Sequence, residues 1–353
     1  MRRYLFGSTV VVLVVTSIAL GEGQGPAGAP TKAYRFERIA NGVHFATGTG
    51  LMTTMSNSMV IENSDHVMLV DTSVTPAAAR ALVAQIKEEL TPKPIKYVFN
   101  SHYHFDHAHG NQIFGDEVEI IGHEYIRRMH LTNVLKQRTN RAFTEVLPKQ
   151  IDDMKQRIAK TTDAKERAQL EAGLRVTEAH AKAVQEVAPK PPNVTFTDVM
   201  TLHKGGREVQ VHFLGRGHTG GDTMVFLPAE RIVFTGDFFE GSPATGILSY
   251  FGDAFIDEWA DSLERMKALD FDIIVPGHGA PFKDRQQITD FQNYIRDLWR
   301  QASALRLQGA TVEQAVEKVD MRKFTARYGP RSARPDPRAV IRAYELLQIQ
   351  MPM

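Results

Sequence analysis

The chain has 353 residues, of which 42% are hydrophobic and 24% charged, and its formal net charge at pH 7 is +1. These values are ordinary for a soluble globular protein of one or two domains. The near-neutral charge provides no electrostatic footprint for nucleic acid or for an anionic membrane, so we expect neither as a partner. Because the chain contains no cysteine, disulfides, redox thiols and a lipidated N-terminal cysteine are excluded.

Residues 1–21 have the pattern of a secretory signal peptide. Arg2 and Arg3 supply a positive start, residues 10–20 an apolar centre, and residues 19–21 small side chains for cleavage. The apolar stretch is shorter than the ~20 residues of a membrane-spanning helix, which favours cleavage over a retained anchor. We therefore expect a periplasmic or secreted bacterial protein without stable membrane association after cleavage. Residues 22–33, rich in Gly and Pro, are expected to form a flexible linker.

Expected strands and helices alternate over residues 34–300, which we take as the main domain. Antiparallel strands are expected over residues 36–61, a buried strand at 67–70, a helix at 75–90, and strands at 95–99 and 118–122. Strands resume at 194–196, 209–214 and 223–227, and a hairpin turn at 227–232 leads into the next strand. The helix expected at 257–269 has its apolar side chains on one face, namely Trp259, Leu263 and Met266.

An insertion at about residues 123–190 differs in composition from the rest of the domain. It is dense in charged residues, Gln and Ala, and predicts two or three amphipathic helices. Breaks are expected at Pro148 and at residues 161–163, where Asp163 is suited to cap a helix. The insertion is expected to be a solvated structural element; a lid over a pocket is the alternative. Its apolar positions are also a candidate homo-oligomer contact, and they are Met129, Leu131, Val134 and Leu135.

The C-terminal extension at residues 301–353 carries no chemical motif. Helices are expected at 285–307, 311–319 and 339–347, with a basic, Pro-rich surface loop at 327–338. We expect these helices to pack against the main domain or against an oligomer partner.

The most informative segment is NSHYHFDH at residues 100–107. It follows the apolar run IKYVF at residues 95–99, which is typical of a buried strand that ends in a loop. The segment brings three imidazoles and a carboxylate together, and these groups are ligands for zinc, iron or manganese. The absence of thiolates argues against a closed structural zinc site.

Four other segments end an apolar run with a residue of the same ligand type. Asp71 ends one such run, and His218, Asp237 and His278 each lie in a Gly-containing turn after another. A strand followed by a ligand, repeated along the chain, predicts a metal site assembled at one edge of the sheets.

This series resembles the metallo-β-lactamase superfamily, whose signatures run Asp, HxHxDH, His, Asp and His in that order. The resemblance covers about residues 36–282 and implies a four-layer αββα sandwich, an α/β fold, here with a helical insertion and a helical C-terminal tail. It also implies two zinc ions per chain, with iron or manganese as alternatives. The implied ligands are His102, His104 and His218 for the first metal and Asp106, His107 and His278 for the second, with Asp237 bridging them.

The resemblance assigns further roles to two carboxylates. Asp71 is expected to orient a ligand imidazole through the nitrogen that faces away from the metal. Asp106 is the expected catalytic residue, which orients the attacking hydroxide and takes its proton. Tyr250, in the aromatic-rich loop 238–255, is a candidate hydrogen-bond donor to an oxyanion of the substrate; simple packing of its ring is the alternative.

The residue type at position 237, which is Asp in this chain, helps to distinguish among the possible activities. Most β-lactamases of this superfamily have Cys or Ser at the matching position, whereas glyoxalase II, lactonases and alkylsulfatases have Asp. The resemblance therefore implies a dinuclear zinc hydrolase that uses metal-bound hydroxide on a small carbonyl substrate, namely an ester, lactone, thioester or amide. Alternatives are a β-lactamase, a mononuclear iron persulfide dioxygenase, and a non-catalytic metal-binding partner of a periplasmic redox system.

Eight of the 13 histidines fall outside these motifs. His109 and His123 lie near the HxHxDH segment and are candidates for the surroundings of the metals or of the pocket. The others are expected to be ordinary surface or hydrogen-bonded histidines.

Overall fold

The computed structural model describes residues 31–241 and 248–350. The expected signal peptide, and all of the expected linker but its last residues, lie outside the described residues. Within the described part, no helix is both long and apolar enough to cross a membrane.

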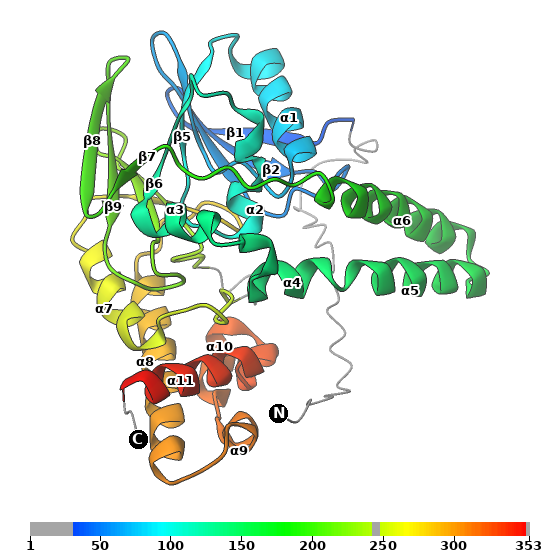
Figure 1. Cartoon of the computed structure of the whole chain (residues 1–353), viewed down its shortest axis with the longest axis vertical. Helices are drawn as coiled ribbons and strands as arrows, with labels where there is room; N and C mark the ends of the chain where they lie inside the picture. The colour runs from blue at the N-terminus through cyan, green and yellow to red at the C-terminus, as the bar shows by residue number, and fades with distance from the viewer. Residues whose placement is uncertain (1–30, 242–247, 351–353) are drawn as a thin grey trace.

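Two sheets form the centre of the described structure (Figure 1). The first has seven strands in the order β1 to β7: β1 Tyr34–Ala40, β2 Val43–Gly48, β3 Ser58–Glu62, β4 Val67–Val70, β5 Ile95–Phe99, β6 Glu119–His123 and β7 Val194–Phe196. The second has five strands in the order β12-β11-β10-β9-β8: β8 Val199–Lys204, β9 Arg207–Phe213, β10 Thr223–Leu227, β11 Ile232–Gly236 and β12 Ile273–Pro276. Strand β8 was not expected from the sequence.

The parallel strand pairs include the strands that precede ligand residues, namely β5, β11 and β12, together with strands adjacent to β5. Strands β4 to β7 run parallel to one another, and β11 runs parallel to β12; the remaining pairs are antiparallel. Since β9 and β11 are each antiparallel to β10, β9 runs in the same direction as β11.

The buried side chains show how the layers stack. In β4, Met68 and Val70 pack with residues of the second sheet, whereas Val67 and Leu69 pack under a helix on the other face. This alternation with a period of two is expected for a strand buried on both faces. The two sheets therefore face each other, and each carries helices on its outer face. The αββα sandwich expected from the sequence is confirmed.

The helix over the first sheet begins as the sequence predicts. Helix α1 spans Pro76–Gln85, with Pro76 at its first turn, and continues as one π-helical turn over Ile86–Leu90. The Thr75 hydroxyl caps its N-terminus by accepting a hydrogen bond from the Ala78 N–H. The next helix, α2 at Phe105–Ala108, is a single turn that carries part of the HxHxDH segment.

The described insertion contains four α-helices rather than two or three. They are α3 Glu124–Leu131, α4 Arg138–Thr144, α5 Leu147–Lys160 and α6 Ala164–Val184. The expected cap is present: the Asp163 carboxylate accepts a hydrogen bond of 2.7 Å from the Glu166 N–H at the start of α6. The two additional short helices, α3 and α4, precede the long ones, and their length gives little periodic signal in the sequence. Helices α5 and α6 form a hairpin that projects from the body of the molecule (Figure 1).

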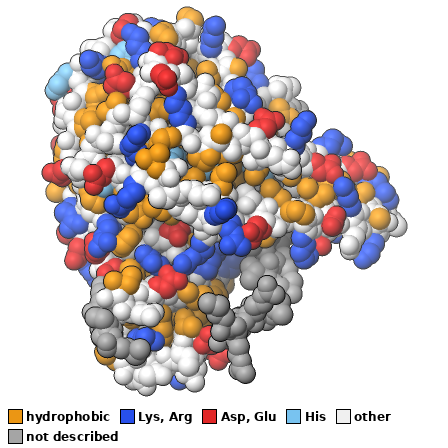
Figure 2. Space-filling model, in the orientation of Figure 1, with side chains coloured by type: hydrophobic (Ala, Val, Ile, Leu, Met, Phe, Trp, Pro, Cys, Tyr) orange, Lys and Arg blue, Asp and Glu red, His pale blue; other side chains and the backbone are white. Residues whose placement is uncertain are grey.

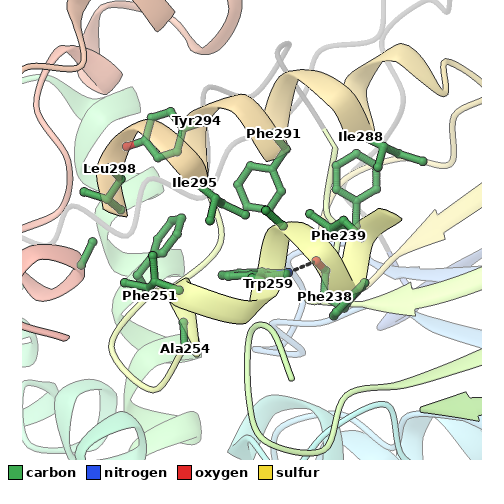
Figure 3. Close-up of a cluster of buried hydrophobic side chains, with 14 of the residues drawn as sticks. Phe238, Phe239, Phe251, Ala254, Trp259, Ile288, Phe291, Tyr294, Ile295 and Leu298 are labelled. Carbon is green, nitrogen blue, oxygen red and sulfur yellow. Dashed lines mark hydrogen bonds between the residues drawn. The ribbon is translucent and has the colours of Figure 1, made fainter. Parts of the chain in front are cut away.

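The C-terminal helices cover the outer face of the second sheet. They are α7 Ile256–Met266, α8 Gln286–Leu307, α9 Val312–Lys318, α10 Thr325–Tyr328 and α11 Pro337–Gln350. Figure 3 shows the aromatic cluster between α7 and α8, in which the Trp259 ring N–H donates a 2.9 Å hydrogen bond to the Phe238 carbonyl. Residues of α9 and α11 belong to the same core cluster, so the extension packs against the sandwich.

The expectation of a surface loop at 327–338 was wrong in part. The segment begins with the end of α10 and continues as a 3-10 turn over Pro330–Ala333. Tyr328 and Ser332 are buried there. The prolines limit helix length, but Tyr328 packs edge-on against Tyr294 of α8 and draws the segment into the core.

Candidate metal centre

The ligand-type residues meet because the strands before them run the same way. His102 and His104 follow β5, and Asp237 and His278 follow the parallel pair β11 and β12. His218 lies in the turn after β9, which also points in that direction. Strands with one direction end at one edge of a sheet, so these residues gather where the corresponding edges of the two sheets meet.

Backbone hydrogen bonds hold the two halves together at this edge. The Thr223 N–H donates to the Ser101 carbonyl at 2.6 Å, and the Asn57 N–H donates to the Gly277 carbonyl at 2.7 Å. Gly277 has to lack a side chain, since a Cβ there would lie 2.3 Å from an oxygen of Asp237.

The first group consists of His102, His104, His218 and Asp237, all buried, and one ligand atom from each lies within 4.8 Å of the others. The Nε2 atoms of His102 and His218 lie 3.8 and 3.6 Å from Asp237 Oδ2. His218 Nε2 also lies 3.0 Å from His104 Nδ1. Four donors that converge in this way can hold one cation.

The second group consists of Asp106, His107 and His278, again with ligand atoms within 4.8 Å of one another. His278 Nε2 lies 3.2 Å from Asp106 Oδ2 and 3.3 Å from Asp237 Oδ2. His107 Nε2 lies 3.2 Å from the other oxygen of Asp237, Oδ1. Asp237 therefore contacts residues of both groups, as a bridging carboxylate does.

The donors fit metal ions. Four buried atoms of this centre have no hydrogen-bond partner: His102 Nε2, His107 Nε2, His218 Nδ1 and Asp237 Oδ1. Buried polar atoms are costly when unpaired, and cations bound at the two groups would satisfy the first two nitrogens and the Asp237 oxygen, which face the groups. The set of nitrogen and oxygen donors without thiolate suits zinc, iron or manganese.

Burial and charge favour the ligand-competent form of some groups only. Burial opposes the charged form of His107 and His278, but Asp237 and Asp106 outweigh it and raise the pKa of both imidazoles well above its ordinary value, so each has to release a proton when a metal binds. Burial lowers the pKa of His218 to about 3 and that of His102 well below its ordinary value, so both imidazoles are neutral. Burial alone would raise the pKa of Asp237, but His107 and His278 outweigh it and hold that pKa well below its ordinary range. Neutral imidazole and ionised carboxylate are the forms that bind metals.

Asp71 lies behind the second group, where the sequence predicted an orienting carboxylate. Its Oδ2 is 2.7 Å from His107 Nδ1, the nitrogen opposite the one that faces Asp237. Asp71 also accepts hydrogen bonds from the N–H and hydroxyl of Ser101, both at 2.7 Å. The contact fixes the orientation of the His107 ring. Asp71 has a φ of +60°, a strained conformation for a non-glycine residue that the surrounding contacts hold in place.

Sequence reasoning missed two carboxylates at the centre. Asp253 Oδ2 lies 3.3 Å from His104 Nε2 and accepts a hydrogen bond from the Thr139 hydroxyl of α4. Glu240 is buried and offers an oxygen to a third group with Asp237 and His278, within the same 4.8 Å limit. Burial and the charge of Asp237 raise the pKa of Glu240 to about 8. Both residues lie in the loop after β11, where no periodic pattern indicates which side chains turn inward.

The remaining candidate residues, Tyr250, His123 and His109, have surroundings that differ from those of the ligand groups. The Tyr250 ring packs 6.0 Å from the His104 ring and lies under the Arg338 guanidinium, at 4.6 Å from the ring centre. His123 stacks on Phe213 and caps α3, which makes it structural. His109 is buried next to the Phe105 ring and belongs to none of the three ligand groups.

The model of the metallo-beta-lactamase superfamily matches residues 51–278. The chain belongs to this superfamily. The match begins after β2 and ends at His278, and curated members of the superfamily include a sulfatase and β-lactamases, which are metal-dependent hydrolases.

Two curated relatives and one solved structure illustrate the likeness. A linear primary-alkylsulfatase from a Pseudomonas species is 26% identical over 291 residues, which is 77% of this chain but 51% of that protein. This chain thus spans about half the length of that relative. A metallo-beta-lactamase type 2 from Bacteroides fragilis is 26% identical over 272 residues, 76% of this chain and 85% of that protein. The structure of a metallo-beta-lactamase from Pontibacter korlensis covers 74% of this chain and 99% of its own, with 18% identity and a TM-score of 0.54, and so supports the fold.

Proposed function

We propose that this chain is a dinuclear zinc hydrolase that cleaves a small carbonyl substrate, namely an ester, lactone, thioester or amide. The observation that carries the proposal is the pair of ligand groups joined by Asp237, whose two oxygens face His107 on one side and His102 and His218 on the other. A centre built for a single metal would not need the second group. This favours the hydrolase over the mononuclear iron oxygenase.

Two bound metal ions would supply a water of lowered pKa and polarise the carbonyl oxygen of the substrate. The chain's own part is to orient and to move a proton. Asp106 lies at the second group, with Oδ2 3.4 Å from His107 Nε2. Burial opposes its charged form, but His107 and His278 hold the pKa of Asp106 well below its ordinary value. Asp106 is therefore an ionised carboxylate, which is the form that accepts a proton.

A β-lactamase is the second candidate, and the Bacteroides relative favours it because 85% of that protein is matched. Asp237 favours the hydrolase of esters, lactones or thioesters over the β-lactamase. A bridging carboxylate adds negative charge to the centre and is typical of superfamily members that cleave substrates other than β-lactams.

The decisive experiment is hydrolysis of a chromogenic cephalosporin by the zinc-loaded protein, with Asp106→Ala as the control. The metal content of both proteins is measured by mass spectrometry, and two zincs per wild-type chain are expected. We expect no cephalosporin turnover, and turnover instead in a panel of lactones, esters and thioesters that is lost in Asp106→Ala. Cephalosporin turnover that the variant lacks would establish the β-lactamase. A chain that holds two zincs and turns over neither class would contradict the proposed hydrolase.

A further inference from the structure

Glu240 adds a carboxylate to the centre that the superfamily signatures do not contain. It lies three residues after Asp237, and one of its oxygens lies within 4.8 Å of ligand atoms of Asp237 and His278. We propose that Glu240 is an additional oxygen ligand of the second metal position and makes that position more selective for oxygen-preferring cations, such as Mn²⁺, than the first. This inference rests on the proposed function and deepens it.

The two positions differ in donor chemistry. Around the first, three imidazoles accompany one carboxylate, Asp237. Around the second, Asp106 and His107 form one group with His278, and Asp237 and Glu240 form another with the same His278. Taken together, the two groups hold three carboxylates and two imidazoles. Imidazole suits zinc, whereas carboxylate oxygen suits harder cations such as manganese. Glu240 therefore shifts the second position from a balanced set of donors to one dominated by oxygen.

The loop backbone holds Glu240 in place. The neighbouring Phe239 packs against Phe291 and Phe282, with ring centres 5.9 and 5.8 Å apart (Figure 3 shows Phe239 beside Phe291). The Thr235 hydroxyl donates a 2.7 Å hydrogen bond to the Phe239 carbonyl. These contacts fix the chain one residue before Glu240, so its side chain is anchored toward the centre from a packed segment.

The burial of the Glu240 carboxylate needs an explanation. The residue is only 7% exposed, and burying a charge is costly unless it is paired or coordinates a metal. A competing role exists, because Glu240 also lines a cavity of about 10 Å³ with Ser249 and Tyr328. A neutral acid beside that cavity would serve packing alone, and metal selectivity distinguishes the two roles.

The test compares Glu240→Gln with the wild-type chain and with Glu230→Gln. Glu230 is a partly buried carboxylate in the turn between β10 and β11, paired with Arg207, and it is absent from the ligand groups. Each protein receives one equivalent of Zn²⁺ and is titrated with Mn²⁺, and free Mn²⁺ is followed by electron paramagnetic resonance. Zn²⁺ binding to the second position is measured in parallel against a chromophoric chelator.

We expect Glu240→Gln to weaken Mn²⁺ binding by at least about tenfold, within the range for lost metal-site partners, and to weaken Zn²⁺ binding less. Glu230→Gln is expected to match the wild type. Equal Mn²⁺ affinity in Glu240→Gln and wild type overturns the inference, as does an equal loss for both metals. If the Gln variant does not fold, Glu240→Asp keeps the charge but shortens the side chain; unchanged Mn²⁺ affinity there overturns the inference, and a tenfold loss supports it. A wild-type chain that takes no second cation of any kind contradicts the proposed function instead.

Discussion

The metal centre and the α5–α6 hairpin are opposite extremes of this molecule. At the centre, His107, His218 and Asp71 are fully buried, and each has contacts to neighbours on other strands or loops. In the hairpin, α6 has no buried residue and α5 has only Leu147. Its helices touch through Met154, which packs on Gly173, and through exposed ion pairs. Figure 1 shows the hairpin extending away from both sheets.

The difference indicates where sequence changes matter. Metal ligands need fixed positions, and the fold supplies them by packing each ligand between the two sheets. The hairpin lacks such packing, so its sequence is constrained mainly by helix formation. Helix α4, at the base of the insertion, connects the two regions by hydrogen bonds. The Thr139 hydroxyl donates to Asp253 next to His104, and Arg138 donates to the Gly252 carbonyl. Substitutions that move from the centre through α4 to the hairpin should have decreasing effects.

The largest effect is expected for Asp237→Ala. Because Asp237 contacts both ligand groups, its loss should weaken both metals, and activity should fall below detection. Metal content after dialysis is the measurement, and we expect less than one zinc per chain. The control is Asp272→Ala, which removes an exposed carboxylate paired with Arg231. Full metal content in Asp237→Ala would refute the bridging role.

Asp253→Asn tests the connection between the insertion and the centre. The substitution keeps the shape of the side chain but removes the charge that faces His104 Nε2. Burial opposes the charged form of Asp253, but the hydrogen bond to His104 and the charge of Arg138 hold the pKa of Asp253 below its ordinary value, so the ionised form is the one lost. We expect a loss of about 10- to 100-fold in affinity for the first metal, as for other partners of ligand imidazoles.

Asp270→Asn serves as the control for that variant, because the Asp270 carboxylate is exposed and pairs with Arg231 at the surface. Metal affinity is measured by competition with a chelator. An Asp253→Asn protein with wild-type affinity would show that His104 needs no such partner and that the insertion does not reach the centre.

Whether a residue of the site could be predicted depends on whether a local sequence pattern marks it. The ligands follow apolar strands, several of them in turns that contain glycine, so their types, order and convergence were predictable. The family resemblance implied that Asp71 orients a ligand imidazole through the nitrogen that faces away from the metal. Asp253 and Glu240 could not be found this way. They lie in a loop whose path depends on packing of Phe239, Phe251 and Trp259 against α8, which no local pattern encodes. The burial of the segment around Tyr328 could not be predicted either, because it depends on packing against Tyr294 of α8.

Arg138→Gln tests the junction itself. Arg138 pairs with Glu345 of α11 and donates to the Gly252 carbonyl, so it joins the insertion, the site loop and the C-terminal helix. Because the pair is partly exposed, we expect only about 1 kcal/mol in the free energy of unfolding and a loss of turnover within about tenfold, caused by a looser loop. Arg141→Gln on the same helix is the control, since Arg141 forms an exposed ion pair with Glu145. Equal turnover in the two variants would show that the junction is structural alone.

The smallest effect is expected at the hairpin, where the same chemical change can be compared at two depths. Met266→Ala in α7 removes a fully buried side chain, and about 2–5 kcal/mol of unfolding free energy should be lost. Met154→Ala in α5 removes a half-buried side chain that packs on Gly173 of the partner helix, so about 1 kcal/mol or less is expected. Denaturant unfolding measures both, and the turnover of Met154→Ala should equal that of the wild type. A fall in turnover without a fall in stability would mean that the hairpin moves over the substrate, because a lid affects catalysis through its position rather than through the stability of the fold.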